Sequence, residues 1–164
     1  MLSAPVIALA VWSTLIGVID LRHRRIPNAL TLPAALSALA WMALHGKSLT
    51  GAPWMSALLA GAFGLAVTLP AYALGKLGAG DAKFLLAIGL LTSWDVTAQT
   101  FVVASLLAAA AATAWWFARN AFKGWQHPWL QQTFEWVVGP GANTGQLRLP
   151  YGTLLAVGLV AALL

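Results

Sequence analysis

The sequence contains no cysteine and very few charged residues. Without cysteine, a disulfide framework, a thiolate zinc site and a cysteine nucleophile are all excluded. Charged residues make up 8% of the chain, against about a quarter of an ordinary soluble domain, while hydrophobic residues make up 60%. The net charge of +5 does not indicate nucleic-acid binding, because the basic residues are spread among apolar runs. These proportions exclude a soluble globular protein and a disordered chain, and they leave an integral membrane protein.

Charged residues divide the 164-residue chain into six long, mostly apolar runs. Four runs reach the roughly 20 residues that a helix needs to cross the hydrocarbon, and two shorter runs need snorkelling side chains or locally thinned lipid. Alanine and leucine dominate and alternation of period two is absent, so helices fit better than barrel strands. The sequence predicts an all-α, polytopic transmembrane helical bundle of about six spans, in a single domain over residues 1–164. The runs are 1–19, 26–46, 48–75, 84–94, 96–118 and 149–164.

The basic residues fall almost entirely on one predicted side of the membrane. Eight of the nine follow spans one, three or five, and Lys47 alone lies on the other side. Because positively charged loops stay cytoplasmic, we expect these three loops inside and both termini outside. The charges follow the first apolar run instead of preceding it, so we interpret that run as a permanent span and not as a cleaved signal peptide. The eight residues are Arg22, Arg24, Arg25, Lys76, Lys83, Arg119, Lys123 and Arg148.

The only long loop, residues 119–148, contains Trp125, Trp129, Phe134 and Trp136 among polar residues, and Pro128 interrupts any continuous helix. Because tryptophan prefers the headgroup layer of a bilayer, we expect this loop to lie along the inner leaflet as an interfacial anchor. A lid that gates access of the substrate is the alternative interpretation.

Only four acidic residues occur in the chain. Acids near a membrane are energetically costly and tend to be functional. Asp20 ends the first span and Asp81 precedes the fourth, so both lie on the predicted cytoplasmic side, where helix packing can bring them together. Asp95 lies on the outer side and Glu135 in the tryptophan-rich loop, and we interpret these two as interfacial charges because nothing apolar traps them.

Asp20 and Asp81 each belong to a short polar string. Asp20 begins Asp-Leu-Arg-His-Arg-Arg-Ile-Pro-Asn, in which a stop-transfer loop explains the arginines and Pro27 but not the acid before them. Asp81 follows Gly78-Ala79-Gly80, and Gly78 and Gly80 lack a Cβ, so the backbone can closely approach a partner helix or a substrate. Alone, this second string is equally well explained as a turn before an Asp-capped helix.

The two strings together resemble those of the prepilin peptidases, polytopic aspartic proteases of bacterial inner membranes. The marks of that family are an Asp upstream of an Ile-Pro-Asn turn and a Gly-x-Gly-Asp-x-Lys block, matched here by 20–28 and 78–83. A third mark, Pro-Phe-Gly or Pro-Tyr-Gly, is matched by 149–152. The resemblance covers essentially the whole chain. It implies that Asp20 and Asp81 are the catalytic pair, that a prepilin is the substrate and that the protein is a multi-pass protein of the bacterial inner membrane.

Larger members of that family carry an additional N-terminal cytoplasmic segment, often with paired cysteines, that is linked to N-methylation of the mature pilin. This chain begins directly in an apolar run and has no cysteine. It therefore resembles the short, Flp-type (tight-adherence) peptidases, and we expect cleavage without a methyltransferase or zinc segment. The presenilin-like proteases match less well, because Ile19 precedes Asp20 where they have tyrosine and no Pro-Ala-Leu follows Asp81.

The implied mechanism is general acid and base catalysis by two carboxyls. Like charges a few ångströms apart cannot both ionise comfortably, so the pair shares one proton. The ionised member takes a proton from water while the protonated member polarises the scissile carbonyl, and no metal or other cofactor is needed. Asn28 and Lys83 are candidates to orient a carboxylate, and Pro27, Gly78 and Gly80 are further candidates to support the site or bind substrate. The alternative interpretations are that Asn28 is a turn residue and Lys83 a snorkelling lysine.

Two functions of other classes stay open from the residues alone. A small non-enzymatic transporter could use Asp20 and Asp81 as a proton relay, but its acids should lie near the bilayer midplane and not at span ends. A structural subunit could pack through the small residues of 61–64 and 108–112. Because every helical bundle needs close packing, those segments do not argue against catalysis elsewhere.

Overall fold

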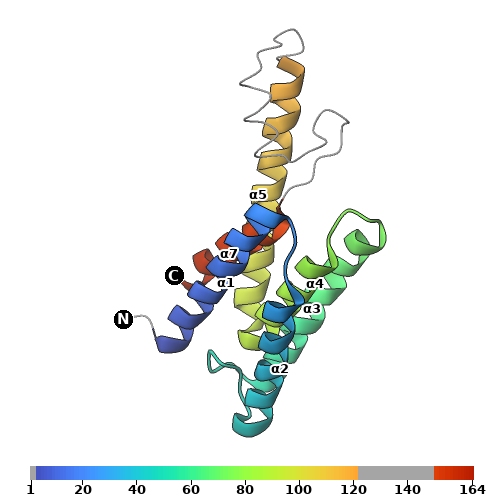
Figure 1. Ribbon diagram of the computed structural model, residues 1–164. Coiled ribbons are helices and arrows are strands. Elements are labelled where there is room, and N and C mark those ends of the chain that lie inside the picture. The colour runs from blue at the N-terminus through green and yellow to red at the C-terminus, as the bar shows by residue number, and fades with distance from the viewer. Residues whose placement is uncertain (1–2, 122–149) are drawn as a thin grey trace.

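The computed structural model describes residues 3–121 and 150–164. Within these ranges the chain forms six α-helices and no β-strand, so the predicted all-α fold is confirmed (Figure 1). Each helix corresponds to one of the six apolar runs. The helices are α1 (Ala4–His23), α2 (Asn28–His45), α3 (Trp54–Ala73), α4 (Ala79–Leu91), α5 (Trp94–Ala121) and α7 (Tyr151–Leu163).

Three of the described helices are long and apolar enough to cross a membrane. These are α1, α3 and the part of α5 from Trp94 to Phe117, while α7 is a shorter apolar helix. The 13 residues of α4 extend over only about 20 Å. Many large apolar side chains on the outside of the bundle are exposed, among them Val11, Leu36 and Leu106, each at 64% or more. Such a surface is that of a helical membrane protein, in which lipid replaces water as the solvent.

The turn between α1 and α2 places Asp20 at a helix end. Arg24 has a positive φ of 50°, and its backbone N–H donates to the carbonyl of Asp20 at 2.7 Å, which closes the last turn of α1. Pro27 then takes the N-cap position of α2, where its missing N–H removes no helical hydrogen bond. Asp20 is therefore held on the rigid end of a helix and not on a loop.

Helix α4 begins earlier than the apolar runs predicted. The run 84–94 placed Asp81 and Lys83 ahead of the helix, whereas α4 starts at Ala79 and includes both. The Oδ2 atom of Asp81 accepts the backbone N–H of Gly78, the N-cap residue, at 3.2 Å. This bond satisfies a donor that the first turn of a helix leaves unpaired, so the helix can start inside the polar string.

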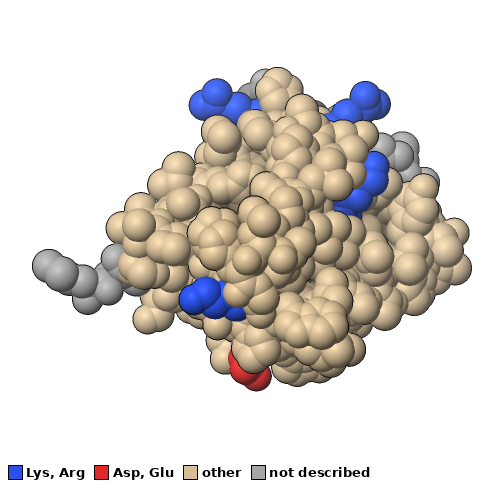
Figure 2. Space-filling model, turned by 90° about the horizontal axis from the view of Figure 1, so that it is seen from below, with Lys and Arg blue, Asp and Glu red and all other residues tan. Residues whose placement is uncertain are grey.

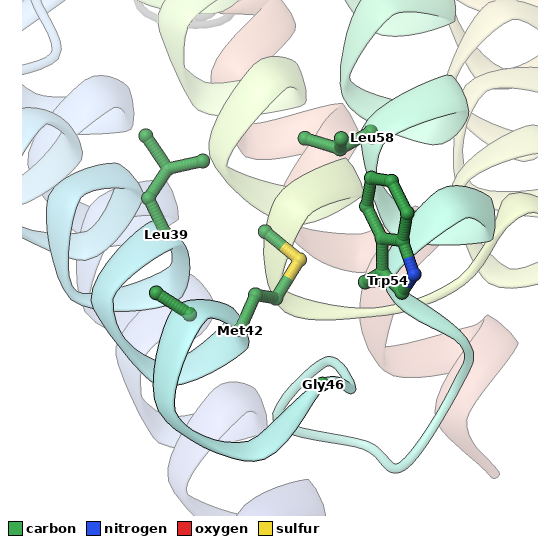
Figure 3. Close-up of a pocket in the computed structure, with 6 residues that line it drawn as sticks. Leu39, Met42, Gly46, Trp54 and Leu58 are labelled. Atoms are coloured by element: carbon green, nitrogen blue, oxygen red, sulfur yellow. The ribbon is translucent and has the colours of Figure 1, made fainter.

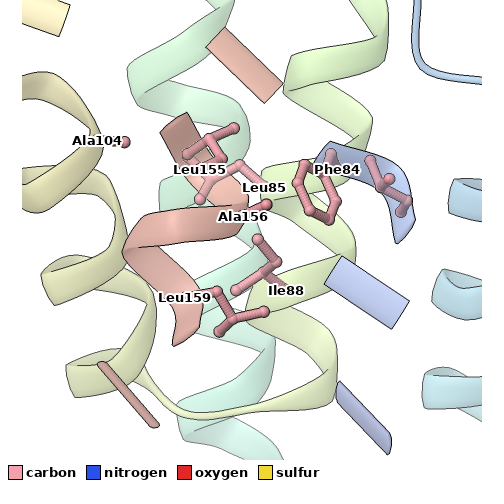
Figure 4. Close-up of a cluster of buried hydrophobic side chains, with 8 residues drawn as sticks. Phe84, Leu85, Ile88, Ala104, Leu155, Ala156 and Leu159 are labelled. Carbon is pink, nitrogen blue, oxygen red and sulfur yellow. The ribbon is translucent and has the colours of Figure 1, made fainter. Parts of the chain in front are cut away.

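Helix α4 is the centre of the bundle. Eight of its 13 residues are buried, and it packs against α2, α3, α5 and α7. Gly61 and Gly64 of α3 lie directly on α4, where a Cβ on Gly64 would be 3.0 Å from the carbonyl oxygen of Leu85. The main apolar cluster joins α4 to α1, α5 and α7 (Figure 4). Its buried members are Ile16, Phe84, Leu85, Ile88, Ala104, Leu155, Ala156 and Leu159.

The end of the bundle where α2 finishes and α3 begins presents few charged or titratable side chains. Seen from this end, most of the visible surface is uncharged (Figure 2). An apolar pocket of about 390 Å³ lies there between α2 and α3 (Figure 3). None of its lining residues is titratable, so this pocket offers no general acid or base. The lining residues are Leu39, Met42, Ala43, Gly46, Trp54 and Leu58.

Apart from the last residues of α5, the tryptophan-rich segment 119–148 lies outside the described residues, and so does Glu135. The interfacial-anchor, lid and surface-charge interpretations of these residues therefore stay predictions.

Candidate active site

The two acids that the sequence singled out lie together at one end of the bundle. Asp20 is in the last turn of α1 and is 5% exposed, and Asp81 is in the first turn of α4 and is half-buried. The two carboxyls interact electrostatically, and the backbone N–H of Gly152 interacts with both. Helix packing thus unites two carboxyls from distant parts of the chain around one backbone donor.

Asp20 is held by the first turn of α7. The backbone N–H of Thr153 donates to Asp20 Oδ2 at 3.0 Å, and Thr153 Oγ1 lies 3.5 Å from the same oxygen. The Thr153 hydroxyl donates to the carbonyl of Gly17 at 2.9 Å, one turn before Asp20. The N–H groups of a first helical turn carry partial positive charge, so they are favourable partners for a carboxylate.

The two glycines of the Gly78–Asp81 string have different structural roles. A Cβ on Gly80 would lie 2.9 Å from the Cβ of Ile26, so glycine at this position lets the turn before α2 pack on the start of α4. A Cβ on Gly78 would lie 3.1 Å from Asp81 Oδ2 and would crowd the carboxyl. The close backbone approach predicted from the glycines is therefore to another segment of this chain at Gly80 and to Asp81 itself at Gly78.

The remaining candidates, Pro27, Asn28 and Lys83, lie near the starts of α2 and α4. Lys83 Nζ donates to Asn28 Oδ1 at 3.0 Å and thereby links the first turn of α2 to the second turn of α4. Pro27 is the N-cap residue that begins α2. These contacts place the three residues on the segments that carry or adjoin the aspartates, and their part in catalysis stays a prediction.

Sequence reasoning missed four residues of this site. Gly152 and Thr153 contact the carboxyls, and the positive charge of Arg24 acts on Asp20, although Arg24 was interpreted only as a topology signal. Tyr151 is close enough for Asp81 to act on it electrostatically, and its hydroxyl lies 3.3 Å from that of Ser105 on α5. The Pro-Tyr-Gly string was the available signal for Tyr151 and Gly152, but nothing in the sequence marked Thr153.

Two buried or half-buried carboxyls around a backbone donor are suited to proton transfer at a peptide bond. The comparison with known families agrees with this chemistry, since residues 7–113 match the model of the type IV leader peptidase family. The chain belongs to the type IV leader peptidase family. This confirms the resemblance to the prepilin peptidases and makes the chain a peptidase whose family acts on prepilins. No curated protein and no solved structure matches the chain significantly.

The family match extends from α1 into α5 and includes both aspartates, but it ends before α7. Membership of a peptidase family favours an enzyme over the proton-relay transporter and the structural subunit. Within the described residues no group of three or more histidine, aspartate or glutamate side chains gathers in one place, so we assign no metal ligands.

Proposed function

We propose that this leader peptidase is an aspartic endopeptidase of the bacterial inner membrane that removes the basic leader from Flp-type prepilins. Asp20 and Asp81 would activate the attacking water at the cytoplasmic membrane face. The observation that carries the proposal is the packing of Ile26 against both Gly80 and Gly152, which brings the start of α4 with Asp81 beside Asp20, within electrostatic reach. An acid and a base that share one proton are sufficient for peptide hydrolysis.

The reaction would proceed through a tetrahedral intermediate. The ionised carboxylate takes a proton from water as the water oxygen bonds to the scissile carbonyl carbon, and the protonated carboxyl gives its proton to the carbonyl oxygen. When the C–N bond breaks, the first carboxyl returns its proton to the departing nitrogen and the second recovers a proton from the intermediate. The pair then holds one proton again and is ready for the next cycle.

The proposed topology has six spans, with both termini outside the cytoplasm. It is supported by the basic residues, because five of the six whose surroundings the structure describes lie on segments at the Asp20 and Asp81 end. The sixth, Lys47, follows α2 at the other end. The five are Arg22, Arg24, Arg25, Lys76 and Lys83.

The position of the carboxyls suits a substrate that is itself anchored in the membrane. The apolar helix of a prepilin would lie in the bilayer and hold the leader junction at the depth of the pair, which replaces much of the entropic cost of orientation. The basic residues at this end repel a basic leader. Recognition would therefore depend on helix packing and on the local acidity of the pair.

We further propose that Asn28, Lys83 and Pro27 support the pair by fixing the starts of α2 and α4, as the 3.0 Å contact from Lys83 to Asn28 suggests. Leader cleavage without N-methylation is proposed as the activity of this single domain.

The proposal is tested by co-expressing the chain with an Flp-type prepilin and following leader removal by gel shift. Asp20→Asn and Asp81→Asn should each abolish processing while the protein still inserts into the membrane, and Asp95→Asn should process normally. Mass spectrometry of the mature pilin should show an unmethylated N-terminus. Normal processing by either Asp20→Asn or Asp81→Asn would refute the aspartic mechanism.

A further inference from the structure

We propose that the first turn of α7 is the third component of the active centre, with Gly152 and Thr153 as positioning residues that set the placement of the two carboxyls. This inference rests on the proposed aspartic mechanism. The family match ends at residue 113, so it assigns no role to α7. The structure, in contrast, brings α7 into hydrogen-bond contact with Asp20 and places its first turn close to Asp81.

Helix α7 is placed to control how α1 and α4 meet. α1 packs extensively against α7, whereas α4 packs mainly against α3 and α2. The backbone N–H of Gly152 interacts with the carboxyl that each of these helices contributes, and the N–H of Thr153 adds a 3.0 Å bond to Asp20. A shift of the α7 turn would therefore change the position of Asp20 relative to Asp81.

Position 152 has no room for a side chain on the side of the carboxyls. A Cβ there would lie 2.5 Å from Ile26 Cδ1 and 3.0 Å from Asp20 Oδ2, with Asp20 Cγ at 3.1 Å. The tip of the isoleucine can rotate away at little cost. The Asp20 carboxyl can give way only by moving from its bond with Thr153. Glycine at this position thus keeps the carboxyl in place and does not merely permit helix packing.

The side chain of Thr153 fixes the same turn from the other direction. Its hydroxyl has one proton, and the nearer acceptor is the carbonyl of Gly17 at 2.9 Å, with Asp20 Oδ2 at 3.5 Å. The bond to Gly17 ties α7 to the last turn of α1. The side chain therefore positions the backbone N–H that Asp20 accepts.

The first test compares Gly152→Ala with the double variant Gly152→Ala/Ile26→Val, with Ile26→Val alone as reference. Valine removes the Cδ1 atom that a Cβ at position 152 would meet, but leaves the contact with Asp20. We measure kcat and KM for a full-length prepilin in proteoliposomes by gel shift. Gly152→Ala should lower kcat between about tenfold and about 100-fold with KM little changed, because small displacements of a reacting group have effects of this size. The double variant should remain equally slow.

Restoration of kcat in the double variant would overturn the inference, because the defect would then be a packing clash with Ile26. Normal kcat in Gly152→Ala would overturn it as well. Gly158→Ala is the matched control on α7, since its Cβ would lie 2.6 Å from the carbonyl oxygen of Thr100 on α5, away from the carboxyls. It should lower thermal stability, but the kcat of the protein that remains folded should be unchanged.

The second test compares Thr153→Val with Thr153→Ser and holds even where Gly152→Ala does not fold. Valine keeps the shape and removes the hydroxyl, so kcat should fall about tenfold with KM unchanged, while serine should restore kcat. Equal kcat in valine, serine and threonine forms would overturn the role of Thr153. The aspartate variants separate the two proposals: active Asp20→Asn refutes the mechanism itself, whereas inactive Asp20→Asn with unaffected α7 variants refutes only this inference.

Discussion

Asp81 and Asp95 lie in the first turns of two consecutive helices, at opposite ends of the bundle. Asp81 is half-buried and interacts with Asp20 and Gly152, while Asp95 is exposed, beside an exposed Trp94. The local setting of both acids is the favourable one for a carboxylate at a helix N-terminus. The two acids differ in the residues that other helices place beside them. Whether an aspartate at a helix start is suited to proton transfer therefore depends on its tertiary neighbours and not on its local sequence.

The turns at the two ends differ in the same way. The turn between α2 and α3 closes on itself, since the backbone N–H of Ser48 donates to the carbonyl of Ala52 at 2.8 Å and the Ser48 side chain accepts the N–H of Ala52 at 3.0 Å. At the end that carries Asp20 and Asp81, Ile26 in the turn before α2 lies against the starts of both α4 and α7, at Gly80 and Gly152. Substitutions in the α2–α3 turn should therefore affect stability, and substitutions where the starts of α2, α4 and α7 meet should affect catalysis.

The largest expected difference is between Asp81→Asn and Asp95→Asn. Asp81→Asn should reduce kcat/KM by about 10⁴-fold or more, because loss of one member of a catalytic unit removes the function of the unit. Asp95→Asn should leave kcat/KM within about twofold of wild type, as expected for an exposed charge. Both values come from prepilin cleavage in proteoliposomes. A similar loss in the two variants would remove the functional contrast between the two ends.

The next contrast is between Gly80→Ala and Gly51→Ala. A Cβ on Gly80 meets Ile26, so alanine should move the start of α4, and with it Asp81, and lower kcat about tenfold. Gly51 has a φ of +90° with open space around it, so alanine there should lower the free energy of unfolding by roughly 1 kcal/mol without changing kcat. Thermal unfolding and cleavage rates measured on the same preparations separate the two effects. Loss of kcat in Gly51→Ala would contradict this assignment.

A smaller effect is expected at the exposed polar contact that joins the starts of α2 and α4. Lys83→Met removes the 3.0 Å bond to Asn28, and we expect cleavage to slow about threefold because such surface contacts contribute little. Asn28→Ala should have the same effect, and Lys47→Met at the other end should have none. A loss as large as that of Asp81→Asn would instead indicate that Lys83 takes part directly in the reaction.

The smallest effect is expected from Tyr151→Phe. The variant removes the 3.3 Å contact with Ser105 and keeps the aromatic ring against α5, so kcat should fall by no more than about twofold. Ser105→Ala removes the same contact from the α5 side and should match it in cleavage rate and melting temperature. A clearly larger loss in Tyr151→Phe than in Ser105→Ala would show that the phenol acts on the carboxyls and not only on helix packing.

The sequence allowed the helices and the closeness of the two aspartates to be predicted for a shared physical reason. A lipid-facing helix must be apolar over its length, so the few acids that remain stand out, and the strings around Asp20 and Asp81 added a family resemblance. The start of α4 was misplaced because an apolar run ends at any charge. Asp81, however, caps its own helix through the N–H of Gly78 and so belongs inside it.

The contribution of α7 could not be predicted in the same way. Thr153 meets Asp20 across 133 positions of sequence, and it does so through a backbone N–H, which every residue except proline has. A side-chain pattern cannot reveal such a donor. The space requirement at Gly152 depends likewise on where Ile26 and Asp20 come to lie, which only the packed bundle defines.

The separation of Thr153 from Asp20 along the chain also has a consequence during biosynthesis. During translation, both aspartates are synthesised and reach the membrane well before α7 does. Until that helix docks, Asp20 lacks the amide donors that hold it, and a nascent chain carries both acids in an unfinished arrangement. Hydrolytic competence would thus arrive only after α7 has been made and has docked.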